Sequence, residues 1–207
     1  MIYTVTLNPA LDKTVQIPSF RLGEVNRISA MRTDPGGKGI NVSKVLRELG
    51  EPSVAAAILG GAAGRKIESA LRALGIEGLY LFTGHETRTN LKIVDPTLHT
   101  NTDVNEPGVP ADEAVLSKLL SQLTGRLRPG DLVVLSGKAP AGAPDTLYRD
   151  WILACRAAGA AVYLDAEGEL LRQGVTAGPA LIKPNQAELS GVMGRPLTTE
   201  DETIRAA

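Results

Sequence analysis

Residues 34–43 read DPGGKGINVS, a stretch with three glycines within four residues. Apolar residues then recur at i, i+3, i+4 and i+7 over residues 42–49, a spacing that predicts an amphipathic helix. Glycine permits positive φ and a close backbone approach to a ligand, and a helix start offers free N–H groups to ligand oxygens. The stretch therefore predicts either a binding loop or an ordinary turn before a helix. Lys38 and Asn41 favour the binding loop, because they place hydrogen-bonding groups where glycine leaves room.

On both sides of this loop, short β-rich runs alternate with helical patterns. Buried strands are predicted at residues 2–7, 54–59, 79–82, 132–135, 161–164 and 180–182. Helical spacing of leucine, isoleucine and alanine recurs over residues 67–74 and 116–123. Gly50, Gly75 and Gly159 follow three helical patterns where a left-handed helix end is expected. This alternation predicts right-handed crossovers and an α/β fold with a mostly parallel sheet covered on both faces.

Two segments, residues 13–33 and 88–104, break this rhythm. They contain alternating polar and apolar runs at residues 14–17, 25–28 and 89–94, and no helical period. Half-buried antiparallel strands fit such alternation. We interpret the two segments as a small β-lid over the carboxyl ends of the main sheet. Open α/β sheets bind ligands at that edge, so the lid would cover a site.

Composition narrows the class of protein. The chain has 207 residues, 43% of them hydrophobic, with 22 Lys and Arg against 23 Asp and Glu, for a net charge of −1. The hydrophobic content indicates a globular domain and argues against disorder. The near-zero net charge argues against a broad positive surface that would bind nucleic acid or an anionic membrane. No apolar run is long enough to span a bilayer. The single Cys155 and the absence of a basic, apolar leader favour the reducing cytoplasm.

Two common nucleotide-binding signatures are missing. A phosphate-binding P-loop needs Gly-Lys followed by Ser or Thr, but here the Gly-Lys pairs precede Gly39 and Ala139. A dinucleotide fingerprint needs G-x-G-x-x-G after the first strand, whereas residues 8–12 read NPALD. A Rossmann dehydrogenase is therefore not expected.

Motifs in a specific order identify a family instead. They are LNPALD at residues 7–12, GGKGINV at 36–42, TDVNEPG at 102–108, LSG at 135–137 and KPNQAEL at 183–189. Together they resemble the ribokinase-like carbohydrate kinases of the phosphofructokinase B family, above all the fructose-1-phosphate and tagatose-6-phosphate kinases. The resemblance covers the whole chain. It implies a ribokinase-like three-layer α/β fold with a mostly parallel central sheet and a small β-lid.

The resemblance assigns sugar-binding roles to five residues. Asp12 matches the carboxylate that accepts hydrogen bonds from sugar hydroxyls, and Gly37, Lys38 and Asn41 match the loop that contacts the sugar. Arg88 matches the arginine that grips the phosphate already present on the sugar, a task that suits a planar guanidinium. Without the resemblance, Asp12 would read as a turn residue and Arg88 as a solvated lid charge.

The resemblance also implies a site for ATP and Mg²⁺. Asn185 and Glu188 match the Asn-x-x-Glu pair that organises magnesium, its waters and the nucleotide phosphates, with Lys183 nearby. A helix that begins here would place both side chains on one face. Such a pair suits magnesium, which binds few protein carboxylates and keeps several waters. Without the resemblance, a capping Asn with a first-turn Glu explains the pair equally well.

The sequence departs from the family pattern in two ways. Lys138 stands where relatives commonly have a small hydroxyl residue; it would reach a phosphate or point to solvent. The Gly-Ala-Gly-Asp helix start, which carries the catalytic aspartate and the anion hole, is not among these residues. We therefore expect the base beyond Ala207, an incomplete kinase domain over residues 1–207, and no catalysis by these residues alone.

Other reactive side chains are given structural roles. Cys155 falls on the expected buried face of a helix with Trp151, which favours a core thiol over a nucleophile. His85 and His99 have no Cys or His partners at ligand spacing, so a transition-metal site is not expected.

The resemblance implies ATP-dependent phosphorylation of a sugar phosphate, with fructose 1-phosphate converted to fructose 1,6-bisphosphate as the leading candidate. Tagatose-6-phosphate kinase or 6-phosphofructokinase activity stays open, as do a non-catalytic sugar-phosphate binder and a kinase for an unphosphorylated sugar or nucleoside. The expected partners are the sugar phosphate and ATP, with a homodimer formed through the lids. No nucleic-acid or membrane partner is expected.

Overall fold

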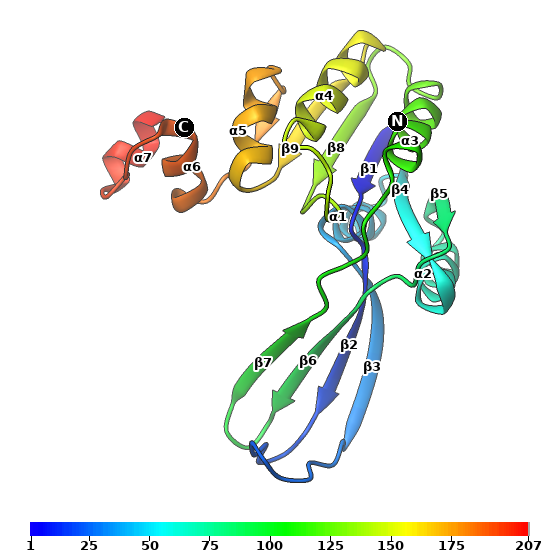
Figure 1. Cartoon of the computed structure of the whole chain (residues 1–207), viewed down its shortest axis with the longest axis vertical. Helices are drawn as coiled ribbons and strands as arrows, with labels where there is room; N and C mark the ends of the chain where they lie inside the picture. Colours follow the sequence, from blue (N-terminus) through cyan, green and yellow to red (C-terminus); the bar gives the residue numbers. More distant parts are fainter. Residues whose placement is uncertain (207) are drawn as a thin grey trace.

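The computed structural model describes residues 1–206, which form a main sheet and a second, smaller sheet (Figure 1). The six-stranded main sheet has the order β10-β9-β8-β1-β4-β5, and all of its pairings are parallel. Its strands are β1 (Ile2–Thr6), β4 (Ser53–Gly60), β5 (Glu77–Thr83), β8 (Leu132–Ser136), β9 (Ala161–Asp165) and β10 (Leu181–Ile182). The predicted α/β fold with a mostly parallel sheet is confirmed.

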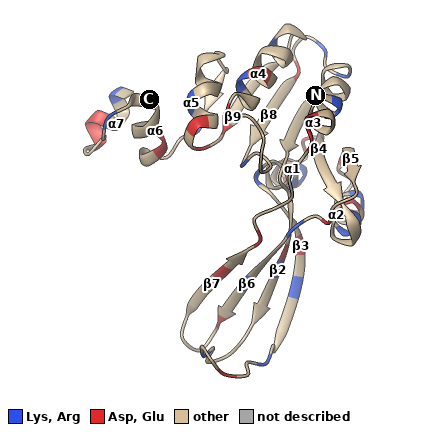
Figure 2. Ribbon diagram, viewed as in Figure 1, with Lys and Arg blue, Asp and Glu red and all other residues tan. Residues whose placement is uncertain are grey.

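Helices cover both faces of the main sheet. They are α1 (Lys38–Glu48), α2 (Gly61–Ala73), α3 (Glu113–Thr124), α4 (Leu147–Ala157) and α5 (Gly168–Thr176). Helix α6 (Gln186–Met193) packs against α5, and α7 (Glu200–Ala206) packs against α6, beyond the sheet (Figure 1). Within residues 1–206, no helix is long and apolar enough to cross a membrane. Basic and acidic side chains are interspersed along the chain, with an acidic first turn in α7 (Figure 2).

Strand β4 separates two hydrophobic cores, because all eight of its residues are buried and successive side chains point to opposite faces. Val54, Ala56 and Ile58 join the core formed with α3, α4 and α5. The residues between them, such as Ala55 and Leu59, join the core formed with α1 and α2. Helix, sheet and helix therefore form three layers.

The helix ends and the single thiol follow the sequence-based predictions. Gly50, Gly75 and Gly159 have φ values of 84°, 71° and 87°, which is the left-handed conformation expected after a helix. Cys155 and Trp151 lie on α4 and are buried in the core between this helix and the main sheet. Burial raises the pKa of the Cys155 thiol to about 12. A thiol with such a pKa stays protonated at neutral pH and is a poor nucleophile.

The second sheet, called the lid here, contains β2 (Ala10–Gln16), β3 (Ala30–Gly36), β6 (Thr89–Asp95) and β7 (Thr100–Asn105) in the order β3-β2-β6-β7. It extends from the edge where β1 and β4 end (Figure 1). The two outer pairings are antiparallel, as expected, but β2 and β6 at the centre pair in parallel. The expectation of antiparallel strands is therefore wrong for this central pair. Between β2 and β6 the chain forms β3, α1, β4, α2 and β5, and this long connection allows β6 to run in the same direction as β2.

One predicted lid strand is absent. The alternating segment at residues 25–28 lies in the loop between β2 and β3, with Val25 83% and Ile28 52% exposed. The Asn26 side chain explains the difference. Its amide donates to the Arg21 and Glu24 carbonyls at 2.7 and 3.0 Å, and its oxygen accepts the Arg21 N–H at 3.0 Å. Such local bonds compete with a strand ladder.

Candidate functional site

The glycine-rich loop packs tightly against the carboxyl end of β1. Gly37 precedes α1 with φ 120°, and the Ile40 N–H donates to Thr6 Oγ1 at 2.9 Å. A Cβ atom built on Gly39 would lie 2.5 Å from the Val5 carbonyl oxygen and 2.6 Å from Thr6 Oγ1. The N-cap residue Gly37 has no side chain to cap α1, so Thr6 supplies the side-chain acceptor for one N–H of the first turn. The loop thus brings backbone and helix N–H groups close to the strand end, where a larger side chain would not fit.

This contact leads to a prediction about Gly39→Ala. We expect the substitution to lower the free energy of unfolding by about 1–3 kcal/mol, because the added methyl group meets backbone that cannot rotate away. Gly191→Ala serves as the control: a Cβ there meets nothing within 4 Å inside α6, so a gain of about 0.5–1 kcal/mol is expected. Urea denaturation of both variants measures the difference, and equal stability of the two would contradict the tight packing.

A cleft of about 520 Å³ lies between the loop, the end of β8 and the base of the lid. It brings together four of the five residues to which the resemblance assigns sugar-binding roles, Gly37, Lys38, Asn41 and Arg88, and it also includes Lys138. The complete lining is Thr6, Asn8, Gly37, Lys38, Asn41, Arg88, Asn90, Asn105, Glu106, Pro107, Ser136, Gly137 and Lys138. The cleft is therefore built from segments that lie far apart in the sequence.

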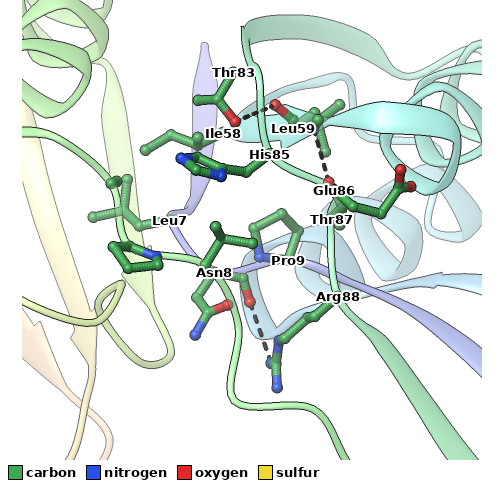
Figure 3. Close-up of a pocket in the computed structure, with 14 residues that line it drawn as sticks. Leu7, Asn8, Pro9, Ile58, Leu59, Thr83, His85, Glu86, Thr87 and Arg88 are labelled. Atoms are coloured by element: carbon green, nitrogen blue, oxygen red, sulfur yellow. Dashed lines mark hydrogen bonds between the residues drawn. The ribbon is translucent and has the colours of Figure 1, made fainter.

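Arg88 is held at the cleft by neutral acceptors. Its Nη1 donates to the Glu106 carbonyl at 3.1 Å and to Asn90 Oδ1 at 3.4 Å. Its Nη2 donates to the Asn8 carbonyl at 3.3 Å, and Figure 3 shows this contact at the edge of a neighbouring pocket that Asn8 and Arg88 also line. Its buried Nε has no partner in residues 1–206, and no described carboxylate lies within ion-pair distance. The guanidinium is thus oriented while its charge stays uncompensated, which suits the binding of an anion.

Asp12 does not line the cleft itself, but it lies beside it on the lid. It sits on β2 between β3 and β6, where its Oδ1 accepts a hydrogen bond from Asn90 Nδ2 at 2.9 Å. It lines a neighbouring hollow on the lid, which shares only Asn90 and Asn105 with the cleft. A Cβ at Gly36 would fall 2.1 Å from the Asp12 carboxylate, so glycine makes room for this side chain. Asn90 connects Asp12 to Arg88 by contacting both.

Asp165 is a site residue that the sequence analysis did not single out. It ends β9, and its carboxylate pairs with two lysines: Oδ1 accepts a hydrogen bond from Lys38 Nζ at 2.9 Å, and Oδ2 forms an ion pair with Lys183 Nζ at 3.3 Å. The Asp165 side chain is only 18% exposed. It therefore joins the glycine-rich loop to the KPN motif. Its position directly after a predicted buried strand was the available signal, because parallel strands bring their carboxyl ends to one edge.

The Asn185 and Glu188 pair forms a reciprocal cap at the start of α6. Asn185 Oδ1 accepts the Glu188 N–H at 2.8 Å, and Glu188 Oε2 accepts the Asn185 N–H at 2.8 Å. The capping interpretation that the sequence left open therefore describes this structure. Neither residue lines the cleft, but Glu188 Oε1 makes no hydrogen bond within residues 1–206. The amide and carboxylate oxygens are the hard ligands that magnesium prefers, so the pair also fits that ion.

Comparisons with known proteins agree on the family. A family model described as pfkB family carbohydrate kinase matches residues 5–207. The 1-phosphofructokinase of Rhodobacter capsulatus is 39% identical, covering 100% of this chain and 66% of its own length. The tagatose-6-phosphate kinase of Staphylococcus epidermidis RP62A is 33% identical, covering 100% of this chain and 67% of its own length.

Solved structures show the same likeness. The phosphofructokinase-2 of Escherichia coli in complex with fructose-6-phosphate superposes with a TM-score of 0.94 at 31% identity, covering 100% of this chain and 68% of that one. The chain spans about two thirds of the length of the curated relatives it matches. The motifs, the three-layer fold and these relatives agree, and the chain belongs to the pfkB family of carbohydrate kinases.

Proposed function

We propose that this protein transfers the γ-phosphoryl group of ATP to a sugar phosphate, with fructose 1-phosphate as acceptor and fructose 1,6-bisphosphate as product. The observation that carries the proposal is Arg88, an oriented guanidinium at the cleft whose described partners are all neutral. Its charge is available for a phosphate that the acceptor already carries. The relatives named 1-phosphofructokinase support the choice of fructose 1-phosphate.

The sugar would be held from both sides of the cleft. Gly37, Lys38 and Asn41 supply donors from the glycine-rich loop, and Arg88 binds the existing phosphate. Asp12 would accept hydrogen bonds from sugar hydroxyls. Because Asp12 lines the adjoining hollow, the acceptor would extend past Asn90 onto the lid, or the lid would move toward the loop. Closure of the lid would also exclude water that competes for the phosphoryl group.

The nucleotide would bind on the side of α6. Lys183 would contact its phosphates, and Asn185 with Glu188 would hold Mg²⁺. The ion, when bound, would neutralise the charge that develops on the phosphate oxygens. Lys38, on the proposed sugar side, and Lys183, on the proposed nucleotide side, both form ion pairs with the Asp165 carboxylate. This shared partner holds the two ammonium groups close together in the ligand-free protein. Use of ATP and the buried Cys155 thiol fit a cytoplasmic enzyme.

Fructose 6-phosphate is the second candidate acceptor, favoured by the close superposition on the fructose-6-phosphate complex of a relative. Tagatose 6-phosphate, a non-catalytic sugar-phosphate binder and a kinase for unphosphorylated sugars are further alternatives. A comparison of fructose 1-phosphate, fructose 6-phosphate, tagatose 6-phosphate and free fructose separates them, using an enzyme of full family length that carries this sequence. We expect the highest kcat/KM with fructose 1-phosphate. Equal use of free fructose would refute a phosphate-specific site.

We also propose that the lid mediates a homodimer. Its edge and tip expose apolar side chains, among them Leu22, Val25, Met31 and Leu98, which are 58–89% exposed. Its own small core of Val15, Ile17 and Ile93 is separate from the two main cores. Exposed apolar strands favour association. Sedimentation of the full-length enzyme over a wide concentration range should show a dimer, and a monomer at every concentration would count against the proposal.

A further inference from the structure

Lys138 follows β8 and lines the same cleft as Lys38 and Arg88. Among the lining residues, these three cations face a single acidic residue, Glu106, whose Oε2 already accepts the Thr89 N–H at 2.8 Å. The lining residues by themselves therefore have an excess of positive charge, with Asp165 and Glu167 pairing with Lys38 and Lys138 from outside the lining. Phosphate is the kind of ligand that such an excess attracts.

The backbone that carries Lys138 is anchored to the core. The Gly137 N–H donates to the Asp165 carbonyl at 2.8 Å, and the Tyr148 hydroxyl donates to the Gly137 carbonyl at 3.0 Å. Tyr148 is fully buried on α4, and burial together with the charge of Asp165 raises the pKa of its hydroxyl, which stays a donor. The turn before Lys138 is thus held in place. Because Lys138 lines the cleft, a ligand bound there would lie beside this anchored residue.

The counter-ion of Lys138 is easily displaced. Lys138 Nζ lies 3.0 Å from Glu167 Oε1, and the two side chains are 70% and 49% exposed. Such exposed ion pairs contribute little to stability. Lys38 differs, because its partner Asp165 is only 18% exposed. Replacing the carboxylate partner with another anion therefore costs less free energy at Lys138 than at Lys38.

We propose that Lys138 is a phosphate-binding residue of the cleft, and that a phosphate oxygen replaces Glu167 as its partner when a phosphorylated ligand binds. The proposal rests on the proposed function, because it requires phosphorylated ligands in this cleft. The phosphate belongs either to the sugar or to the nucleotide, and the two sources share the same chemistry. Glu167 then acts as a competitor for Lys138 in the ligand-free protein.

Calorimetric titration of the purified protein tests this role. The ligands are fructose 1-phosphate, free fructose, a non-hydrolysable ATP analogue and inorganic phosphate. Lys138→Gln is expected to weaken binding of the phosphorylated ligand by about 10- to 100-fold, the effect of losing one charged hydrogen bond. Glu167→Gln is expected to strengthen it by up to about fivefold, because the competing carboxylate is gone. Lys66→Gln, an exposed lysine on α2, is the matched control and should change nothing.

The opposite signs of the two variants distinguish the proposal from a structural ion pair, whose loss would weaken binding in both. An effect on fructose 1-phosphate alone assigns the phosphate to the sugar, and an effect on the ATP analogue alone assigns it to the nucleotide. Unchanged binding of every phosphorylated ligand by Lys138→Gln overturns the proposal, as does a wild-type protein that binds none of them. If only fructose 1-phosphate fails to bind the wild type, the proposed acceptor is wrong, and the other two ligands still decide the role of Lys138.

Discussion

Replacing Arg88 with alanine is expected to reduce kcat/KM for phosphorylated sugars by about 30- to 1,000-fold in a family-length enzyme, while ATP binding stays nearly unchanged. The loss corresponds to about 2–4 kcal/mol for a charge-assisted, bidentate contact with phosphate. The structure supports this size of effect, because Arg88 has no described carboxylate partner that would compete with the ligand.

Two further variants make the Arg88 measurement specific. Arg88→Lys keeps the charge but not the planar fork, so it should recover only part of the activity. Arg65→Ala removes an exposed arginine from α2 and should leave the kinetics unchanged. Because Arg88 also bonds to the carbonyls of Asn8 and Glu106, thermal unfolding should accompany the kinetics. Unaltered kcat/KM with all sugar phosphates would remove Arg88 from the site.

Residues 1–207 by themselves are expected to show no measurable kinase turnover, although they should still bind a sugar phosphate. Each described carboxylate around the cleft already has a partner. Asp165 binds two lysines, Asp12 accepts from the Asn90 amide, and Glu106 accepts the Thr89 N–H. A placed base is worth roughly 10²- to 10⁴-fold and an anion hole about 10²- to 10³-fold, so lack of both would put the rate below detection.

A coupled assay for ATP consumption, run beside a family-length enzyme, measures this difference. The preparation needs a confirmed mass and a control for contaminating host kinases. Calorimetry with fructose 1-phosphate shows in parallel that the chain is folded and binds its ligand. Robust phosphorylation of fructose 1-phosphate by residues 1–207 would contradict the prediction. It would then point to Asp165 as the first candidate base, because it lies between Lys38 and Lys183.

The strands and helices of the main sheet could be predicted because each of them has its own hydrophobic pattern in a short stretch of sequence. Apolar runs and helical spacing located the strands and helices, and positive φ at Gly50, Gly75 and Gly159 follows from their place after helices. The lid was less predictable. Its alternation indicated strands, but the loop around Asn26 replaced one of them, and β2 pairs in parallel with β6 across more than seventy residues of chain. Local periodicity carries no information about such a distant partner.

The candidate site shows the same division. The glycine-rich motif drew attention to Lys38 and Asn41, and the family resemblance added Gly37 and Arg88; the structure places all four at one cleft. Placement of Asp12 in the adjoining hollow required the lid pairing, which sets it beside Asn90.

What the sequence by itself determined is the identity and order of the main-sheet strands, of the helices with apolar repeats and of the motifs, because hydrophobic periodicity and turn chemistry act between near neighbours. Only the tertiary structure decided which charges meet. The strand order β10-β9-β8-β1 brings the ends of separate strands to one edge, so Asp165 receives Lys38 from α1 and Lys183 from beyond β10. The same order sets Lys138 opposite Glu167. These contacts depend on strand order, which is a property of the folded chain and is not encoded in any single segment.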